Sequence, residues 1–133
     1  MFGYPRPWMP RGRTILVVED DADLRRMFRT TLAFSGFRVL EAGDGLSALH
    51  QLDTERPDLV ILDLGLPLVS GHVVRQEIAA HAHTRDIPIV VVTGTPTSRD
   101  SINVTCLLRK PVGPDELVQT VRTCLASGAR RAV

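Results

Sequence analysis

The stretch 58–67 reads Asp-Leu-Val-Ile-Leu-Asp-Leu-Gly-Leu-Pro, and it decides the fold. Its four consecutive apolar residues, 59–62, are typical of a short strand buried on both faces, as in the middle of a parallel sheet. Gly65 and Pro67 favour a turn directly afterwards, so we expect Asp63 at the carboxyl end of a central strand. Open α/β sheets place ligands and reactive groups at that edge.

Other short apolar runs and helical patterns surround this stretch. Further strands are predicted at 14–18, 37–41, 87–92 and 106–108. Helices are predicted at about 22–35, from the cap residue Asp44 to just before Pro57, at 71–82, and from Pro114 to Gly128. Their apolar faces are expected to carry Leu24, Met27, Phe28 and Leu32, then Leu46, Leu49 and Leu52, then Val73, Val74 and Ile78, and finally Leu117, Val121 and Leu125.

Strands that alternate with helices predict an α/β fold with a parallel sheet covered on both faces. We expect a flavodoxin-like, doubly wound sheet of five strands in the order 2-1-3-4-5. One domain at 14–127 accounts for all of these elements. Residues 1–13, with three Pro and two Gly and no periodicity, are predicted to form a disordered or loosely held tail, and 128–133 a short C-terminal tail.

Composition excludes several classes of protein. The chain of 133 residues has 44% hydrophobic residues and a net charge of +1, which gives no bulk electrostatic case for nucleic acid or an anionic membrane. No apolar run approaches the length of a membrane helix, and no N-terminal stretch resembles a secretory signal. We therefore expect a cytoplasmic protein with no direct nucleic-acid contact and no membrane insertion.

The cysteines and histidines give no metal-binding pattern in the sequence. Cys106 and Cys124 are widely spaced and are interpreted as small buried hydrophobic residues. No pair of histidines has good metal spacing with a carboxylate, and all are expected on the solvated surface. They are His50, His72, His81 and His83.

Polar residues follow four of the five predicted strands. Glu19 and Asp20 follow the first strand and Asp63 the third. Thr93 follows the fourth strand and Lys110, the only lysine beside fifteen arginines, follows the fifth. In the predicted strand order these side chains meet at one edge of the sheet.

Three carboxylates at one edge repel each other unless a cation lies between them. Oxygen ligands favour Mg²⁺, which Glu19, Asp20 and Asp63 would hold together with the backbone carbonyl of Gly65. Asp63 can then act as a nucleophile toward phosphorus, and Lys110 supplies a compact positive charge for phosphoryl oxygens. The hydroxyl of Thr93 supplies a hydrogen bond to one of those oxygens.

This constellation resembles the receiver domain of two-component response regulators, in the CheY-like superfamily. The resemblance covers roughly 14–125 of the chain. Its motifs are Ile-Leu-Val-Val-Glu-Asp-Asp at 15–21, Leu-Asp-Leu-Gly-Leu-Pro at 62–67, Gly71, Val-Val-Thr-Gly at 91–94 and Lys110-Pro111.

The resemblance implies the roles of these residues. Asp63 would be the phosphoacceptor for a histidine kinase or a phosphotransfer protein, with Mg²⁺ as cofactor. Glu19 and Asp20 match the family's acidic pair, Thr93 its switch hydroxyl and Lys110 its lysine. The Lys110–Pro111 peptide bond is expected to be cis.

Two positions depart from the family pattern. Leu107 stands where the family often has Tyr or Phe, so the aromatic part of the switch is missing. Only sixteen residues separate Thr93 from Lys110, and the segment 94–105 shows no apolar helical stripe. We therefore predict that the fourth helix is absent or strongly shortened, with signal output altered accordingly.

Three functional interpretations follow. The leading one is a phosphoacceptor domain, acting as a stand-alone switch or phosphorelay element toward an unidentified downstream protein, or as the receiver piece of a longer regulator or hybrid kinase. It would not be an enzyme, beyond self-phosphorylation from small donors and slow self-dephosphorylation. The alternative is a pseudo-receiver, a protein-interaction module without a phosphorylation-dependent switch. A flavodoxin-like redox module is disfavoured, because the acidic stretch 19–21 would repel a flavin phosphate.

Overall fold

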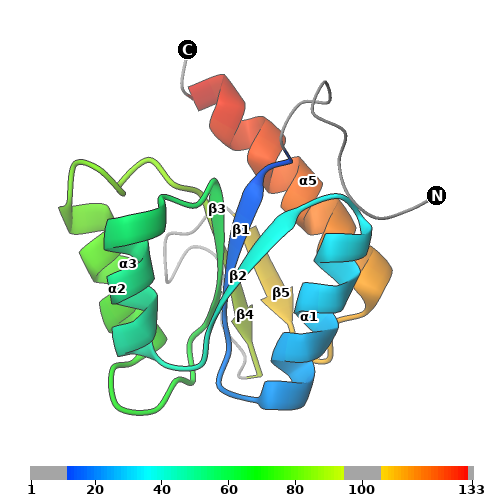
Figure 1. Cartoon of the computed structure of the whole chain (residues 1–133), viewed down its shortest axis with the longest axis horizontal. Coiled ribbons are helices and arrows are strands. Elements are labelled where there is room, and N and C mark those ends of the chain that lie inside the picture. The colour runs from blue at the N-terminus through cyan, green and yellow to red at the C-terminus, as the bar shows by residue number, and fades with distance from the viewer. Residues whose placement is uncertain (1–11, 95–105, 132–133) are drawn as a thin grey trace.

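The computed structural model of the chain describes residues 12–94 and 106–131 (Figure 1). Within these ranges, five parallel strands form a sheet in the order β2-β1-β3-β4-β5, which confirms the predicted topology. The strands are β1 (Thr14–Val18), β2 (Arg38–Ala42), β3 (Leu59–Asp63), β4 (Ile89–Thr93) and β5 (Cys106–Arg109).

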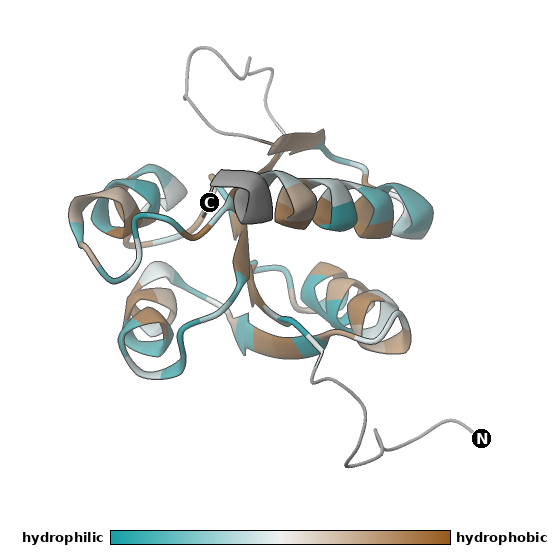
Figure 2. Ribbon diagram, turned by 90° about the horizontal axis from the view of Figure 1, so that it is seen from above, coloured by the Kyte–Doolittle hydropathy of each residue, from teal (hydrophilic) through white to brown (hydrophobic). Residues whose placement is uncertain are grey.

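Two layers of helices cover the sheet. The helices are α1 (Ala22–Phe34), α2 (Gly45–Glu55), α3 (Gly71–Ala80) and α5 (Pro114–Arg131). Helices α1 and α5 contact each other on one side of the sheet, and α2 and α3 contact each other on the opposite side (Figures 1 and 2). The fold is therefore the flavodoxin-like, doubly wound arrangement expected from the alternation of strands and helices.

The core has two halves because consecutive strand residues point to opposite faces of the sheet. Ile15 packs with Phe28 of α1 on one face, whereas Leu16 packs with Leu52 of α2 on the other. Every residue of β3 is buried, as expected for the central strand of a covered parallel sheet. This burial holds β3, and with it Asp63, in a defined position.

Aspartates precede two of the helices, and the cap at Asp44 was predicted. The side chain of Asp21 accepts hydrogen bonds from the backbone N–H groups of Asp23 and Leu24. The side chain of Asp44 accepts one from the N–H of Ser47 at 2.8 Å. Each aspartate thus satisfies backbone donors that have no partner within the helix.

The predicted faces of α2 and α3 were partly wrong. Leu46 is 59% exposed and Val73 is 43% exposed, although both were assigned to apolar faces. The small residues Gly45 and Ala48 are buried in α2 instead. A Cβ at Gly45 would lie 2.6 Å from the carbonyl oxygen of Val69, so close packing against the β3–α3 loop leaves no room for a larger side chain there.

Several element ends also differ from the prediction. Helix α3 ends at Ala80, and α5 continues past Gly128 to Arg131, so part of the predicted C-terminal tail is helical. A glycine inside a helix costs only about 1 kcal/mol relative to alanine, which the good helix formers on both sides can offset. Cys124 is buried as expected, but Cys106 is only partly buried at the start of β5.

Two predictions lie outside the described residues. They are the shortened fourth helix, which concerns 95–105, and most of the N-terminal tail at 1–11. Within the part of the chain that is described, no helix has the length and apolarity needed to cross a membrane.

Candidate functional site

The carboxyl ends of β1, β3, β4 and β5 lie side by side and position the predicted site residues. In the register, Val18 pairs with Leu62, and Asp63 pairs with Val92. Glu19 and Thr93 therefore lie close to the level of Asp63 on the neighbouring strands. The edge is at the bottom of Figure 1, where β1 leads into α1.

Three carboxylates gather at this edge, as the sequence predicted. Glu19 is 1% exposed and Asp63 is 5% exposed, whereas Asp20 is exposed to solvent. Each residue offers one oxygen, and these three oxygens lie within 4.8 Å of one another. The geometry therefore provides a pocket with two buried acids and one acid at its mouth.

Lys110 reaches into the acidic pocket from the end of β5. Its Nζ lies 2.9 Å from Glu19 Oε1 and 3.4 Å from Asp63 Oδ2. The N–H of Lys110 donates to the carbonyl oxygen of Thr93 at 2.9 Å, which ties the end of β5 to the end of β4. The Lys110–Pro111 peptide bond is cis, as expected.

The pKa values of Glu19 and Lys110 are both shifted in this pocket. The pKa of Glu19 is raised to about 7, mainly by burial and to a lesser extent by the charge of Asp63. The hydrogen bonds from Lys110 and from the backbone N–H of Asp21 act in the opposite direction. Burial lowers the pKa of Lys110, but its interactions with Glu19 and Asp63 outweigh this effect and raise the pKa overall.

The donor set fits a hard divalent cation. Glu19 Oε1 is buried and, apart from its ion pair with Lys110, has no hydrogen-bond partner among the described residues. One ammonium group also leaves the charge of three carboxylates only partly balanced. Closely spaced carboxylate oxygens with one exposed member are the ligands that Mg²⁺ prefers, since it retains water molecules in its coordination shell.

The β3–α3 loop restrains the side chain of Asp63 through a hydrogen bond. Asp63 Oδ1 accepts a hydrogen bond from the N–H of Gly65 at 3.0 Å. The N–H of Gly71 donates to the carbonyl oxygen of Leu64 at 3.3 Å, which closes the loop over a short span. A Cβ at Gly71 would lie 2.3 Å from the carbonyl oxygen of Asp63, so only glycine permits this approach of α3. The carbonyl of Gly65 as a metal ligand stays a prediction.

Thr93 and Leu107 occupy the places expected from the sequence. Thr93 is 3% exposed at the end of β4, and its backbone carbonyl accepts from Lys110. Leu107 is partly buried on β5 and packs against the small cluster formed by Leu64 and Val91. Leu107 thus places an aliphatic side chain with apolar neighbours where the family often has Tyr or Phe.

One residue of the site was missed by the sequence interpretation. Arg25 of α1 donates from Nη1 to the backbone carbonyl oxygen of Glu19 at 2.7 Å. Its Nε also lies 3.4 Å from Glu41 Oε1 on β2. Arg25 thereby stabilises the loop that carries Glu19 and Asp20. No motif or spacing in the sequence predicts that Arg25 contacts Glu19 and Glu41.

Comparison with known proteins identifies the fold and the family. The family model described as response regulator receiver domain matches residues 15–122. PhoB of Escherichia coli K12, a phosphate regulon transcriptional regulatory protein, is 36% identical over 119 residues, which are 86% of this chain and 52% of PhoB. The chain spans about half the length of the curated relatives it matches.

Two solved structures show the same architecture. The chemotaxis response regulator CheY4 of Vibrio cholerae has a TM-score of 0.79 at 27% identity, with 85% of this chain and 98% of that chain covered. The receiver domain of sensor histidine kinase PA1611 from Pseudomonas aeruginosa has a TM-score of 0.80 at 27% identity, with 86% and 98% covered. That structure has a magnesium ion coordinated in its active-site cleft. The chain belongs to the response regulator receiver domain family.

Proposed function

We propose that this domain accepts a phosphoryl group on Asp63 from a histidine kinase or a histidine phosphotransfer protein. The observation that carries the proposal is the position of the Asp63 carboxylate, which lies 3.4 Å from the ammonium group of Lys110 and has an oxygen within 4.8 Å of carboxylate oxygens of Glu19 and Asp20. Asp63 is therefore close both to an ammonium group that can bind phosphoryl oxygens and to carboxylates that can bind a divalent cation.

The reaction transfers phosphorus from nitrogen to oxygen. An oxygen of Asp63 forms the new P–O bond while the P–N bond of a phosphohistidine breaks, and the electron pair of that bond leaves with the imidazole. Lys110 is within reach of the phosphoryl oxygens because its Nζ already lies 3.4 Å from Asp63 Oδ2. The N–H of Gly65 orients Asp63 through its 3.0 Å hydrogen bond to Oδ1.

Glu19, Asp20 and Asp63 would hold Mg²⁺, together with the carbonyl of Gly65. The ion supplies charge neutralisation for the incoming phosphoryl group. The hydroxyl of Thr93 is the group that we assign to the remaining phosphoryl oxygen, as the switch that reports phosphorylation to the rest of the domain.

The same site chemistry predicts limited activity of its own. A small donor such as acetyl phosphate would phosphorylate Asp63, and slow hydrolysis of the acyl phosphate would return the carboxylate. We place the domain in the cytoplasm as a switch or phosphorelay element that acts on a downstream protein.

A pseudo-receiver is the second candidate, and Leu107 favours it. Leu107 already packs against Leu64 and Val91 and has no ring that could turn inward with Thr93. In this alternative the domain would bind a partner without a response to phosphate. The two candidates differ in a single measurable property, the conformational response to an occupied Asp63.

Intact-mass measurement after incubation with acetyl phosphate and Mg²⁺ tests the proposal. We expect the mass of one phosphoryl group on the parent protein and no gain on the Asp63→Asn variant. Beryllofluoride, which mimics an acyl phosphate, then provides the response test by NMR. No mass gain together with no beryllofluoride binding would refute the phosphoacceptor function, whereas binding without shifts beyond the pocket would favour the pseudo-receiver.

A further inference from the structure

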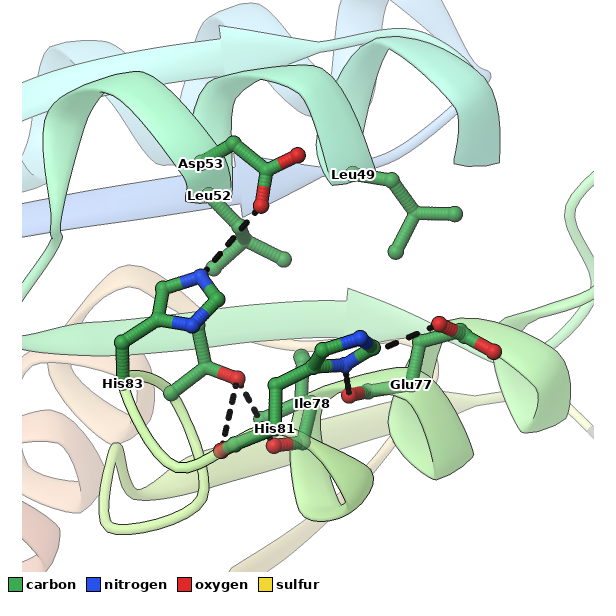
Figure 3. Close-up of a pocket in the computed structure, with 8 residues that line it drawn as sticks. Leu49, Leu52, Asp53, Glu77, Ile78, His81 and His83 are labelled. Carbon is green, nitrogen blue, oxygen red and sulfur yellow. Dashed lines mark hydrogen bonds and ion pairs between the residues drawn. The ribbon is translucent and has the colours of Figure 1, made fainter.

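A second group of metal-ligating side chains lies between the C-terminal parts of α2 and α3. These parts of the helices lie toward the opposite edge of the sheet from Asp63. A cavity of about 230 Å³ there is lined by Asp53 of α2, Glu77 of α3, and His81 and His83 after α3 (Figure 3). Leu49, Leu52 and Ile78 provide apolar walls.

The two histidines face this cavity and each other. Their ring centroids are 5.8 Å apart and the ring planes make an angle of 69°. Two imidazoles that bind one ion at about 2.0–2.1 Å would place their centroids roughly 5–6 Å apart. The observed separation of the rings therefore already suits shared coordination.

The hydrogen bonding of His81 selects the tautomer that binds metals. His81 Nδ1 lies 2.8 Å from the backbone carbonyl oxygen of Glu77 and must donate its proton there. The lone pair is then on Nε2, which Figure 3 shows directed toward the space between the two helices. A histidine held by a backbone carbonyl at one nitrogen is a common arrangement in metal sites.

Carboxylates adjoin both rings. His83 Nε2 lies 3.3 Å from Asp53 Oδ1, which connects the segment after α3 to α2 across thirty positions of the sequence. His81 Nδ1 lies 3.7 Å from Glu77 Oε2. Two neutral imidazoles with two carboxylates give a donor set that balances the charge of a divalent ion.

We propose that His81 and His83, with the carboxylate of Asp53, bind Zn²⁺ or a similar transition-metal ion that links α2 to α3. Glu77 completes the set as a fourth ligand. Nitrogen and oxygen donors together favour Zn²⁺, whereas Mg²⁺ prefers oxygen ligands alone, so the site is chemically distinct from the acidic pocket.

Binding requires small movements of surface side chains. Among the described residues, only the acidic pocket holds three candidate ligand atoms within 4.8 Å of one another. Exposure of these side chains ranges from 39% for His83 to 71% for Asp53, so the rings and carboxylates can turn toward a common ion without disturbing the core. His83 would exchange its contact with Asp53 for a bond to the metal.

Calorimetric titration with Zn²⁺ in excess Mg²⁺ tests the proposal. The variant His81→Gln/His83→Gln removes the imidazoles, and His50→Gln/His72→Gln is the matched control because those histidines are exposed elsewhere on α2 and α3. A third variant, Glu19→Gln/Asp20→Asn, removes oxygens of the acidic pocket. Circular dichroism confirms that each variant is folded before titration.

We expect one Zn²⁺ per parent chain, with affinity retained in the control and in the acidic-pocket variant. Loss of His81 and His83 should weaken binding at least tenfold. The proposal is overturned if the parent does not bind Zn²⁺ with saturation, if His81→Gln/His83→Gln binds as the parent does, or if binding disappears with the acidic-pocket variant. Equal weakening by the control substitutions would also overturn it.

Discussion

Substitution of Gly71 by alanine tests how the fold positions the phosphoacceptor. An added Cβ would lie 2.3 Å from the carbonyl oxygen of Asp63 and 2.6 Å from Leu64 Cα. Ordinary contact begins at 3.4 Å, so the helix or the strand must retreat by about 1 Å. Both obstructing atoms belong to the backbone of β3 and its loop, which cannot rotate away as a flexible side chain could.

The expected cost of Gly71→Ala is about 3 kcal/mol of unfolding free energy, at the upper end of the ~1–3 kcal/mol typical of overpacking. The better helix propensity of alanine returns no more than ~1 kcal/mol of this. For a domain of this size, such a loss lowers the unfolding midpoint by roughly 10 °C. Phosphorylation by acetyl phosphate should also slow, because the displaced atoms belong to Asp63 and its neighbour.

Urea denaturation and the initial rate of phosphorylation measure these effects. Gly113→Ala is the matched control, since a Cβ there meets nothing within 4 Å and Gly113 directly precedes α5, so that both glycines lie at the start of a helix. We expect the control to change the unfolding free energy by less than about 0.5 kcal/mol. A Gly71→Ala protein with the stability and phosphorylation rate of the parent would refute the packing argument.

Three further predictions concern the acidic pocket, its support and the core. The pKa of Glu19 is about 7 in the folded chain and 4.5 ordinarily, so the folded state binds this proton more tightly than the unfolded state does. Without metal, the free energy of unfolding should therefore fall as the pH rises from about 4.5 to 7. Glu19→Gln should remove up to ~3 kcal/mol of this fall in unfolding free energy, measured by urea denaturation with chelator at pH 5 and pH 8. An unchanged pH dependence would contradict the raised pKa of Glu19. Arg25→Met should cost about 1–3 kcal/mol and weaken Mg²⁺ binding because the carbonyl of Glu19 loses its 2.7 Å hydrogen bond. Arg26→Met is the control, since Arg26 is 67% exposed and pairs with Asp23 at 3.8 Å, and equal effects of the two substitutions would remove the role given to Arg25. Phe28→Ala should cost about 3–5 kcal/mol in thermal or chemical unfolding because Phe28 is fully buried. Phe34→Ala, at a side chain that is 90% exposed, should change stability by less than about 0.5 kcal/mol, and a similar loss for both phenylalanines would contradict the description of the core.

The sequence predicted the strand order and the gathering of the acidic residues because both follow from local patterns. Apolar runs locate buried strands, and a parallel sheet brings their carboxyl ends to one edge. Glu19 and Asp63 directly follow such runs and Lys110 follows one after Arg109, so their meeting follows from the topology. Their distances then agree with the expected chemistry.

The features that the sequence did not predict depend on contacts between distant segments. Leu46 and Ala48 are both compatible with an apolar helix face, and only the packing of α2 against the β3–α3 loop decides which is buried. Arg25 meets the carbonyl of Glu19 through the angle at which α1 leaves β1. Asp53 on α2 meets His83 in the segment after α3, and no local spacing indicates such a pair.

The position of the acyl phosphate is the most direct test of the central proposal. After phosphorylation with acetyl phosphate and Mg²⁺, borohydride reduction converts an aspartyl phosphate to homoserine, which peptide mass spectrometry locates. We expect homoserine at position 63 alone, with none in samples that lacked the donor. Modification at Asp20 or at any other carboxylate, with Asp63 unchanged, would contradict it.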